Sequence, residues 1–324
     1  MTDIKKKIML GGVLQKIHVR THDESKPVLL FLHGGPGVCN RHDIILNHAD
    51  LLDSFTVATW DQRGSGGSYR GVPLHTLTCE QLTDDAAELV NWLCERFHKD
   101  KIFVIGGSWG SVLGTLLIKK YPQRIAAFVG FGQVVDGAKN EEISFRFAMD
   151  AAKAAGDDEA VKKLQSVGPP VKGCYKGGFD GMMTQRNIMM QYGGYSKNEK
   201  KRSYFDGFVK PMVLSGEYTV GDLIGLALGH KRVLKAMWPE VGAISFPETH
   251  TEFAVPYFIF DGRLDMNTPA ELVQEWYNTI KAPYKELIWF ENSGHNPMND
   301  EGAQFKALLR QRLLQVKENE ECVI

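Results

Sequence analysis

Cysteine is scarce in this sequence and widely spaced where it occurs. The chain of 324 residues contains five cysteines, and none forms a Cys-x-x-Cys pair; they are Cys39, Cys79, Cys94, Cys174 and Cys322. Small secreted domains that depend on disulfides carry an even number of closely set cysteines, and structural zinc sites use paired ligands. We therefore expect free thiols and no metal site.

An excess of charge of either sign is also missing. The 38 basic and 39 acidic residues give a formal net charge of −1, so there is no electrostatic argument for nucleic-acid binding. Gly11 and Gly12 interrupt the only apolar patch near the amino terminus, which is too short for a signal peptide or a membrane helix. We expect a cytoplasmic protein that acts on a small molecule, with no nucleic-acid or membrane partner. The oligomeric state stays open.

What the sequence does contain is a serine between glycines at a strand-to-helix turn. Residues 102–105 are apolar, as in a buried strand, and apolar residues recur at helical spacing after Gly110. So tight a turn strains the residue at its apex, Ser108, and needs neighbours without side chains, which Gly106 and Gly110 provide. A chance Gly-x-Ser-x-Gly sequence is the alternative. We interpret the stretch as the nucleophile elbow of an α/β-hydrolase.

Other apolar runs end in glycine-rich loops, which is typical of a parallel sheet covered by helices on both faces. Strand patterns occupy residues 28–32, 55–60, 102–105, 125–131, 255–260 and 285–290. Alternation over residues 9–21 predicts an antiparallel hairpin, and helical spacing predicts helices over residues 79–97 and about 300–316. The sequence thus predicts the α/β-hydrolase fold, with a mostly parallel, eight-stranded sheet flanked by helices.

The middle of the chain has a different pattern. Between residues 132 and 250 no convincing strand occurs, and amphipathic windows cover residues 141–155, 157–167, 203–215 and 219–229. We predict that residues 132–250 form an inserted, all-helical lid. Residues 1–131 and 251–324 would then form the catalytic domain.

A serine needs a base within hydrogen-bond reach, and the base must be oriented by a third group. In α/β-hydrolases the acid and the histidine follow the serine in that order. Asp265 and His295 lie in the loops after the last two predicted strands, whose carboxyl ends meet at one edge of a parallel sheet. His295 is the predicted base and Asp265 the predicted acid. Asp261 competes with Asp265, although it comes directly off the strand and could instead hold the turn.

His33 is the other histidine at a strand end. Its glycine-rich loop is better suited to presenting an amide than a base, so we assign the amides of Gly35 and Trp109 to an oxyanion hole. His33 would then hydrogen-bond its own loop in place. After the next strand, Asp61 and Arg63 are predicted to pair with each other and to brace the loops around the site.

Five motifs together resemble the prolyl aminopeptidase (proline iminopeptidase) family of α/β-hydrolases. They are His33-Gly-Gly-Pro-Gly37, Asp61-Gln-Arg-Gly64, Gly106-Gly-Ser-Trp-Gly-Ser111, Gly262-Arg-Leu-Asp265 and Ser293-Gly-His295. The resemblance covers the whole predicted catalytic domain. It implies a nucleophile at Ser108, an acid at Asp265 and a base at His295, the residues already chosen.

The predicted lid departs from this family. Members that cleave amino-terminal proline are similar in carrying a Glu-Asn-His-Tyr-Phe segment whose glutamate receives the free amine, whereas the nearest match here is Lys201-Arg-Ser-Tyr-Phe205. Glu217 and Asp222 are the candidates to replace that carboxylate, with helix capping as the alternative. Tyr204 is a candidate for the substrate pocket, and packing between lid helices is its alternative.

These features predict a cofactor-free serine hydrolase that acts through an acyl-enzyme, as an aminopeptidase that releases proline or another small residue from small peptides. A carboxylesterase or lactonase with the same triad is the alternative. Epoxide hydrolases and dehalogenases of this fold use an aspartate nucleophile, so Ser108 argues against them. A binding protein on a hydrolase scaffold commonly lacks a triad member, and all three positions are filled here.

Overall fold

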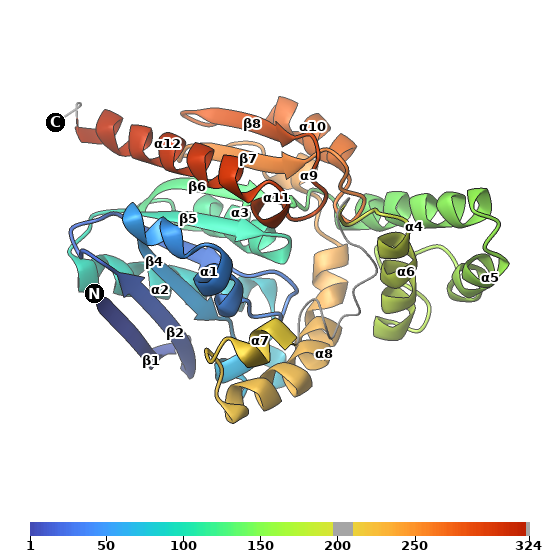
Figure 1. The fold of residues 1–324 in the computed structure, drawn as a ribbon, viewed down its shortest axis with the longest axis horizontal. Coiled ribbons are helices and arrows are strands. Elements are labelled where there is room, and N and C mark those ends of the chain that lie inside the picture. The colour runs from blue at the N-terminus through green and yellow to red at the C-terminus, as the bar shows by residue number, and fades with distance from the viewer. Residues whose placement is uncertain (197–209, 322–324) are drawn as a thin grey trace.

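The computed structural model describes residues 1–196 and 210–321, with side chains described as far as residue 318. Within this part, eight strands form one sheet in the order β1-β2-β4-β3-β5-β6-β7-β8 (Figure 1). The strands are β1 (Thr2–Leu10), β2 (Val13–Thr21), β3 (Val28–Leu32), β4 (Thr56–Asp61), β5 (Ile102–Gly107), β6 (Ile125–Phe131), β7 (Tyr257–Gly262) and β8 (Lys285–Phe290). β2 pairs antiparallel with β1 and β4, and all other pairs are parallel. The predicted fold class is confirmed.

Burial explains the two kinds of strand pattern. Every residue of β3, β4, β5 and β7 is buried, as expected where helices cover both faces of a parallel sheet. The β1–β2 hairpin lies at the edge, and most side chains of β1 are partly or fully exposed. This hairpin begins at Thr2, earlier than residue 9, because the lysines of β1 hide its strand pattern from a reading based on apolar residues. Gly11 and Gly12 form its turn with positive φ.

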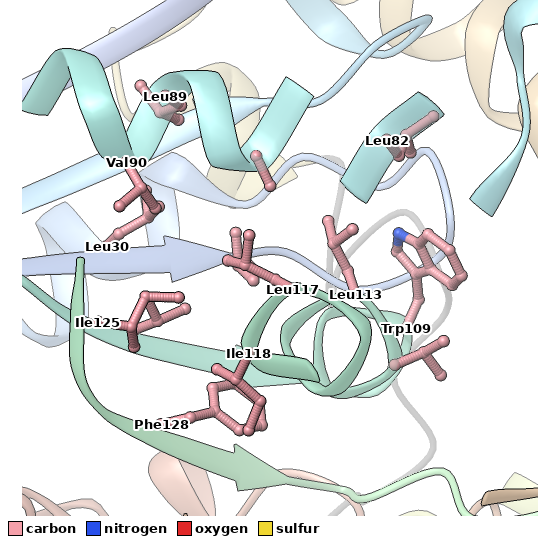
Figure 2. Close-up of a cluster of buried hydrophobic side chains, with 14 of the residues drawn as sticks. Leu30, Leu82, Leu89, Val90, Trp109, Leu113, Leu117, Ile118, Ile125 and Phe128 are labelled. Carbon is pink, nitrogen blue, oxygen red and sulfur yellow. The ribbon is translucent and has the colours of Figure 1, made fainter. Parts of the chain in front are cut away.

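Helices cover the sheet on both faces. One hydrophobic cluster joins it to α2 (Cys79–Phe97), α3 (Trp109–Lys120) and α10 (Ala270–Thr279), and a second joins its other face to α1 (Arg41–Asn47) and α12 (Gly302–Glu321). Figure 2 shows the first cluster, with Leu89, Leu117 and Phe128 among its side chains. Truncating a buried leucine of this kind costs about 2–5 kcal/mol. The first cluster therefore fixes α3, the helix that follows the elbow. The predicted helix over residues 79–97 is confirmed, with Thr78 accepting the cap hydrogen bond from the Gln81 amide.

The shorter helices complete the described secondary structure. They are η1 (Ala49–Asp53), η2 (Gly66–Ser68), η3 (Leu74–Thr76) and α11 (Pro297–Asp300). All four lie in loops between the main strands and helices.

Between β6 and β7 the described chain is helical and contains isolated bridges but no named strand. Its helices are α4 (Gly137–Ala154), α5 (Asp158–Val167), α6 (Phe179–Gln191), α7 (Lys210–Leu214), α8 (Val220–Gly242) and α9 (Phe246–Thr249). Figure 1 shows α4, α5 and α6 projecting from the end of the sheet and α7 and α8 beside it. The sequence reading missed α6 and ended α8 too early, and most of the window over residues 203–215 lies outside the described residues. The division into a catalytic domain and a lid of residues 132–250 stays a prediction.

Candidate active site

Ser108 has the backbone conformation of a strained turn. It lies between β5 and α3 with φ 56° and ψ −123°, a region that residues with side chains rarely adopt. A methyl group on Gly106 would lie 2.1 Å from the carbonyl oxygen of Gly110, and one on Gly110 would lie 2.0 Å from that of Leu32. Both flanking positions therefore require glycine, as the sequence predicted.

Asp265 and His295 meet at the carboxyl ends of β7 and β8. Nδ1 of His295 lies 2.8 Å from Oδ2 of Asp265, and the two residues are 5% and 0% exposed. The amides of Asn267 and Thr268 donate to Oδ1 of Asp265 over 2.7 and 2.9 Å, and the Thr268 hydroxyl donates to Oδ2. These donors hold the carboxyl group of Asp265 against the imidazole.

The pair and the elbow lie on either side of the end of β6. The Ser108 amide donates to the carbonyl of Phe131 over 3.0 Å. A methyl group on the next residue, Gly132, would lie 2.8 Å from Cε1 of His295. The structure thus brings the three residues of the predicted triad to one edge of the sheet. Nε2, the ring nitrogen that faces away from Asp265, lies 3.1 Å from the side-chain nitrogen of Asn267.

Tyr195, from the segment after α6, packs directly on His295. The His295 amide donates to the Tyr195 carbonyl over 2.6 Å, and the two ring centroids are 4.9 Å apart. A methyl group on Gly294 would lie 2.1 Å from that carbonyl, so only glycine allows this approach. From the sequence, Tyr195 could line a substrate pocket or pack between helices of the predicted lid. The glycine directly before the histidine was the signal of a close neighbour.

Gln62 connects the two loops that carry the predicted oxyanion amides. Its side-chain nitrogen donates to the carbonyl of His33 over 3.0 Å, and its side-chain oxygen accepts from the indole of Trp109 over 2.9 Å. A methyl group on Gly34, the neighbour of Gly35, would lie 3.3 Å from Cβ of Ser108. The glycine-rich loop therefore reaches the elbow. Sequence reasoning missed Gln62, although it stands in the Asp-Gln-Arg-Gly motif.

His33 holds its loop in place, as predicted. Nδ1 donates to the carbonyl of Gly34 over 2.8 Å, and Nε2 accepts from the Gln62 amide over 3.1 Å. This assignment of the proton follows from the amide, which can only donate. Burial lowers the pKa of His33 to about 4, against the effect of the hydrogen bond to Gly34. A neutral histidine with both nitrogens engaged is a structural element of the loop.

Asp61 and Arg63 brace the site, but the prediction that they pair with each other is wrong. Oδ1 of Asp61 accepts from Nε of Arg41 at 3.1 Å, and Nε of Arg63 donates to Asp85 at 2.7 Å. The chain turns sharply after β4, so that Asp61 faces the start of α1 and Arg63 faces α2. Each buried charge finds its own partner there, because leaving it unpaired would be costly.

The predicted amine anchors lie in a different part of the molecule. Glu217 contacts Lys5 at 3.0 Å and His18 at 3.2 Å, on the two edge strands, and β4 and β3 separate these strands from β5. Asp222 caps α8 in a capping box and accepts from Lys16 and Arg41. Burial alone would raise the pKa of Asp222, but these hydrogen bonds lower it to about 2. The capping alternative is confirmed for Asp222. Tyr204 and Lys201 lie outside the described residues.

Among the described residues, no group of three His, Cys, Asp or Glu side chains is arranged to hold a metal ion. The cysteines within this part are free thiols: Cys39, Cys79, Cys94 and Cys174. No helix in the described ranges is long and apolar enough to cross a membrane.

Comparison with known proteins agrees with this fold. Residues 27–171 match the model of a family described as the alpha/beta hydrolase fold. A probable proline iminopeptidase of Leptolyngbya boryana is 34% identical over 282 residues, covering 84% of this chain and 82% of that protein. The probable aminopeptidase YbaC of Bacillus subtilis is 26% identical over 93% of both chains. The crystal structure of the proline iminopeptidase of Mycobacterium smegmatis superposes with a TM-score of 0.67, at 17% identity and over 98% of this chain and 100% of that one. The chain belongs to the proline iminopeptidase family of α/β-hydrolases.

Proposed function

We propose that the protein is a serine hydrolase that acts through an acyl-enzyme on Ser108. The observation that carries the proposal is the buried Asp265–His295 pair, which lies at the same edge of the sheet as a serine in a strained elbow. Asp265 orients His295, and the amides of Gly35 and Trp109 form the oxyanion hole. No metal or cofactor takes part in this scheme, and residues 132–250 act as its lid.

The chemistry follows from these roles. His295 Nε2 takes the proton of the Ser108 hydroxyl while Oγ of Ser108 attacks the carbonyl carbon of the substrate. The amides of Gly35 and Trp109 stabilise the oxyanion that forms. The proton then passes to the leaving amine as the acyl-enzyme forms. Water attacks the ester with the same histidine as base, which releases the acid and restores Ser108.

We further propose that the substrate is a small peptide with proline or another small residue at its amino terminus. An exopeptidase has to pair the free ammonium with a carboxylate, because an unpaired charge in a dry pocket is costly. Glu217 stays a candidate, although its carboxylate is already engaged by Lys5 and His18.

Glu141, near the start of α4, is a second candidate that the sequence reading did not consider. It is 2% exposed, and while Oε1 pairs with Arg186, Oε2 has no hydrogen-bond partner among the described residues. The neighbouring Asn140 donates to the carbonyl of Asn267 over 2.7 Å, and the side chain of Asn267 touches His295. An ammonium group would supply the missing partner of Glu141 close to the reacting centre.

A substrate panel tests this function. Proline p-nitroanilide should be cleaved, and its N-acetyl derivative, which lacks the free amine, should not. The hydrolysis of short p-nitrophenyl esters should not depend on a free amine in this way. Glu141→Gln should lower kcat/KM for the free amine by about 10- to 100-fold, the value of one charge-assisted hydrogen bond of about 1.5–3 kcal/mol, with little effect on the esters. Glu217→Gln, assayed in the same way, tests the other candidate, and only the variant of the true anchor should lose its preference for the free amine. Fast ester turnover with uncleaved proline p-nitroanilide would favour the esterase alternative.

A further inference from the structure

A second buried carboxyl group lies beside the predicted catalytic acid. Asp261 belongs to β7, and both Asp261 and Asp265 are 0% exposed. The amide of Asp265 donates back to the carbonyl of Gly262 over 3.3 Å, so the loop turns tightly and keeps the two residues together. Two acidic side chains therefore share one region without solvent.

Hydrogen-bond donors are distributed unequally between the two groups. Asp265 receives two amides, a hydroxyl and the imidazole of His295. Oδ1 of Asp261 accepts from the Gln133 amide at 3.3 Å, which is long for such a bond, and Oδ2 has no hydrogen-bond partner among the described residues. Because an ionised carboxylate needs donors on both oxygens, this arrangement favours the negative charge on Asp265.

The electrostatics point in the same direction. Burial raises the pKa of Asp261 well above 3.8, and the nearby charge of Asp265 raises it further, against the effect of the amides of Gln133, Gly132 and Gly262. Two like charges in a dry site repel strongly, so one of the two carboxyl groups keeps its proton.

The cations on the neighbouring described segments are engaged by groups other than Asp261. The titratable and charged groups on the neighbouring segments are Tyr257 on β7, Arg263 and Asp265 in the loop after β7, Lys285 and Glu286 on β8, Glu291 and His295 after β8, and Asp136 after β6. Lys285 donates to the carbonyl of Tyr277, and Glu286 pairs with Arg312. Arg263 pairs with Glu291 on the surface, and His295 pairs with Asp265. Burial raises the pKa of Tyr257, which is therefore neutral, and its hydroxyl lies 2.6 Å from that of Thr115 on α3. Within the described part of the chain, no ion pair involves Asp261.

We propose that Asp261 is a neutral carboxylic acid in the resting protein and a positioning residue for Asp265. By keeping its proton, Asp261 leaves Asp265 as the single anion that orients His295. This role of Asp265 rests on the proposed function. When Asp261 ionises at alkaline pH, repulsion between the two anions moves the acid loop and lowers the reactivity of Ser108.

Urea unfolding of wild type and Asp261→Asn from about pH 5 to about pH 9 locates the proton without any need for activity. An unfolded aspartate loses its proton near pH 4, whereas Asp261 keeps it in the folded state, so wild-type stability falls as pH rises through this window. The folding constant of wild type should fall relative to that of the variant by up to tenfold per pH unit. A ratio that stays constant with pH overturns the proposal. If Asp261→Asn does not fold, the pH dependence of wild-type stability can be compared with that of Asp261→Ser instead.

The rate of Ser108 labelling by a fluorophosphonate tests the positioning role. At pH 7, Asp261→Asn should lower the rate less than tenfold and Asp265→Asn more than a hundredfold. The wild-type rate should decline at alkaline pH, and Asp261→Asn should lack this decline. Equal losses in the two variants, or the same alkaline decline in both wild type and Asp261→Asn, would show that Asp261 does not play this part. If wild-type protein is not labelled, the proposed function fails, and the unfolding experiment still locates the proton.

Discussion

The two halves of the site use histidine in opposite ways. In the proposed acid–base half, formed by the loops after β7 and β8, His295 pairs with a carboxylate through Nδ1, and its Nε2 lies 3.1 Å from the side-chain nitrogen of Asn267. In the proposed oxyanion half, formed by the loops after β3 and β4, His33 is held between the Gly34 carbonyl and the Gln62 amide. A carboxylate partner prepares an imidazole to accept a proton, whereas two neutral backbone partners in a buried site keep it uncharged. The partner, more than the residue type, determines the role.

Ser108→Ala should have the largest effect, because both halves act on this side chain. The triad works as a unit, so we expect a loss on the order of 10⁴ to 10⁶ in kcat. The elbow accommodates a smaller side chain, so the melting temperature should stay close to that of wild type. Steady-state assays and calorimetry on the same preparation check both points. Activity within tenfold of wild type would remove Ser108 from the mechanism.

Asp265→Asn breaks the acid–base half alone. The amide offers an N–H where Nδ1 of His295 needs an acceptor, which favours the wrong tautomer, and kcat should fall on the order of 10³ to 10⁴. KM should change little, because Asp265 contacts His295 and its own loop and has no role in the proposed binding of substrate. The split between kcat and KM is measured on one ester and one p-nitroanilide. A pure KM effect would contradict the assignment.

Gln62→Ala breaks the oxyanion half. It removes the acceptor of the Trp109 indole and the donor to the His33 carbonyl, and so loosens both amide-bearing loops. Displacement of an oxyanion donor by a fraction of an ångström should cost on the order of 10- to 100-fold in kcat, since a misplacement of about 1 Å can cost about 10². Gln15→Ala is the matched control, because this buried glutamine likewise accepts from an indole, that of Trp60, and lies on β2. If both variants lose stability equally and Gln62→Ala keeps its kcat, the brace is structural only.

The sequence was sufficient to predict those features of the fold and the site that depend on one local rule. Glycines around Ser108 predict the elbow, helical spacing predicts α2, and apolar strands ending in glycine-rich loops predict which side chains gather at the sheet edge. Asp265 and His295 could be chosen because parallel strands place their following loops side by side. Each of these inferences needs only neighbours in sequence or in the sheet.

Partners set by packing at long range could not be predicted in this way. Asp61 and Arg63 are two residues apart, yet they pair with Arg41 on α1 and Asp85 on α2. The approach of Tyr195 to His295 depends on how the insertion folds back over a loop that lies 100 residues further along the chain. Similarly, α6 begins directly after Gly178, in a region whose composition is typical of a loop.

The smallest expected effect is on the pH dependence of folding stability. His33 in the oxyanion half and Asp261 beside the acid–base half should contribute to it with opposite signs. Unfolded histidine takes up a proton below about pH 6.5, whereas His33 stays neutral down to its pKa of about 4, so His33 lowers stability as pH falls through this window. The stability of wild type relative to His33→Gln should therefore decrease by roughly 2 kcal/mol between pH 7 and pH 5, at about 1.4 kcal/mol per pH unit. Urea unfolding at several pH values measures the difference, and His22→Gln is the control, because His22 is exposed. The opposite sign is expected of Asp261, whose proton stabilises the folded state less as pH rises. If the stability of wild type relative to His33→Gln instead decreases as pH rises, His33 is charged in the folded state. The proposed contrast between a neutral His33 and a carboxylate-paired His295 would then be wrong.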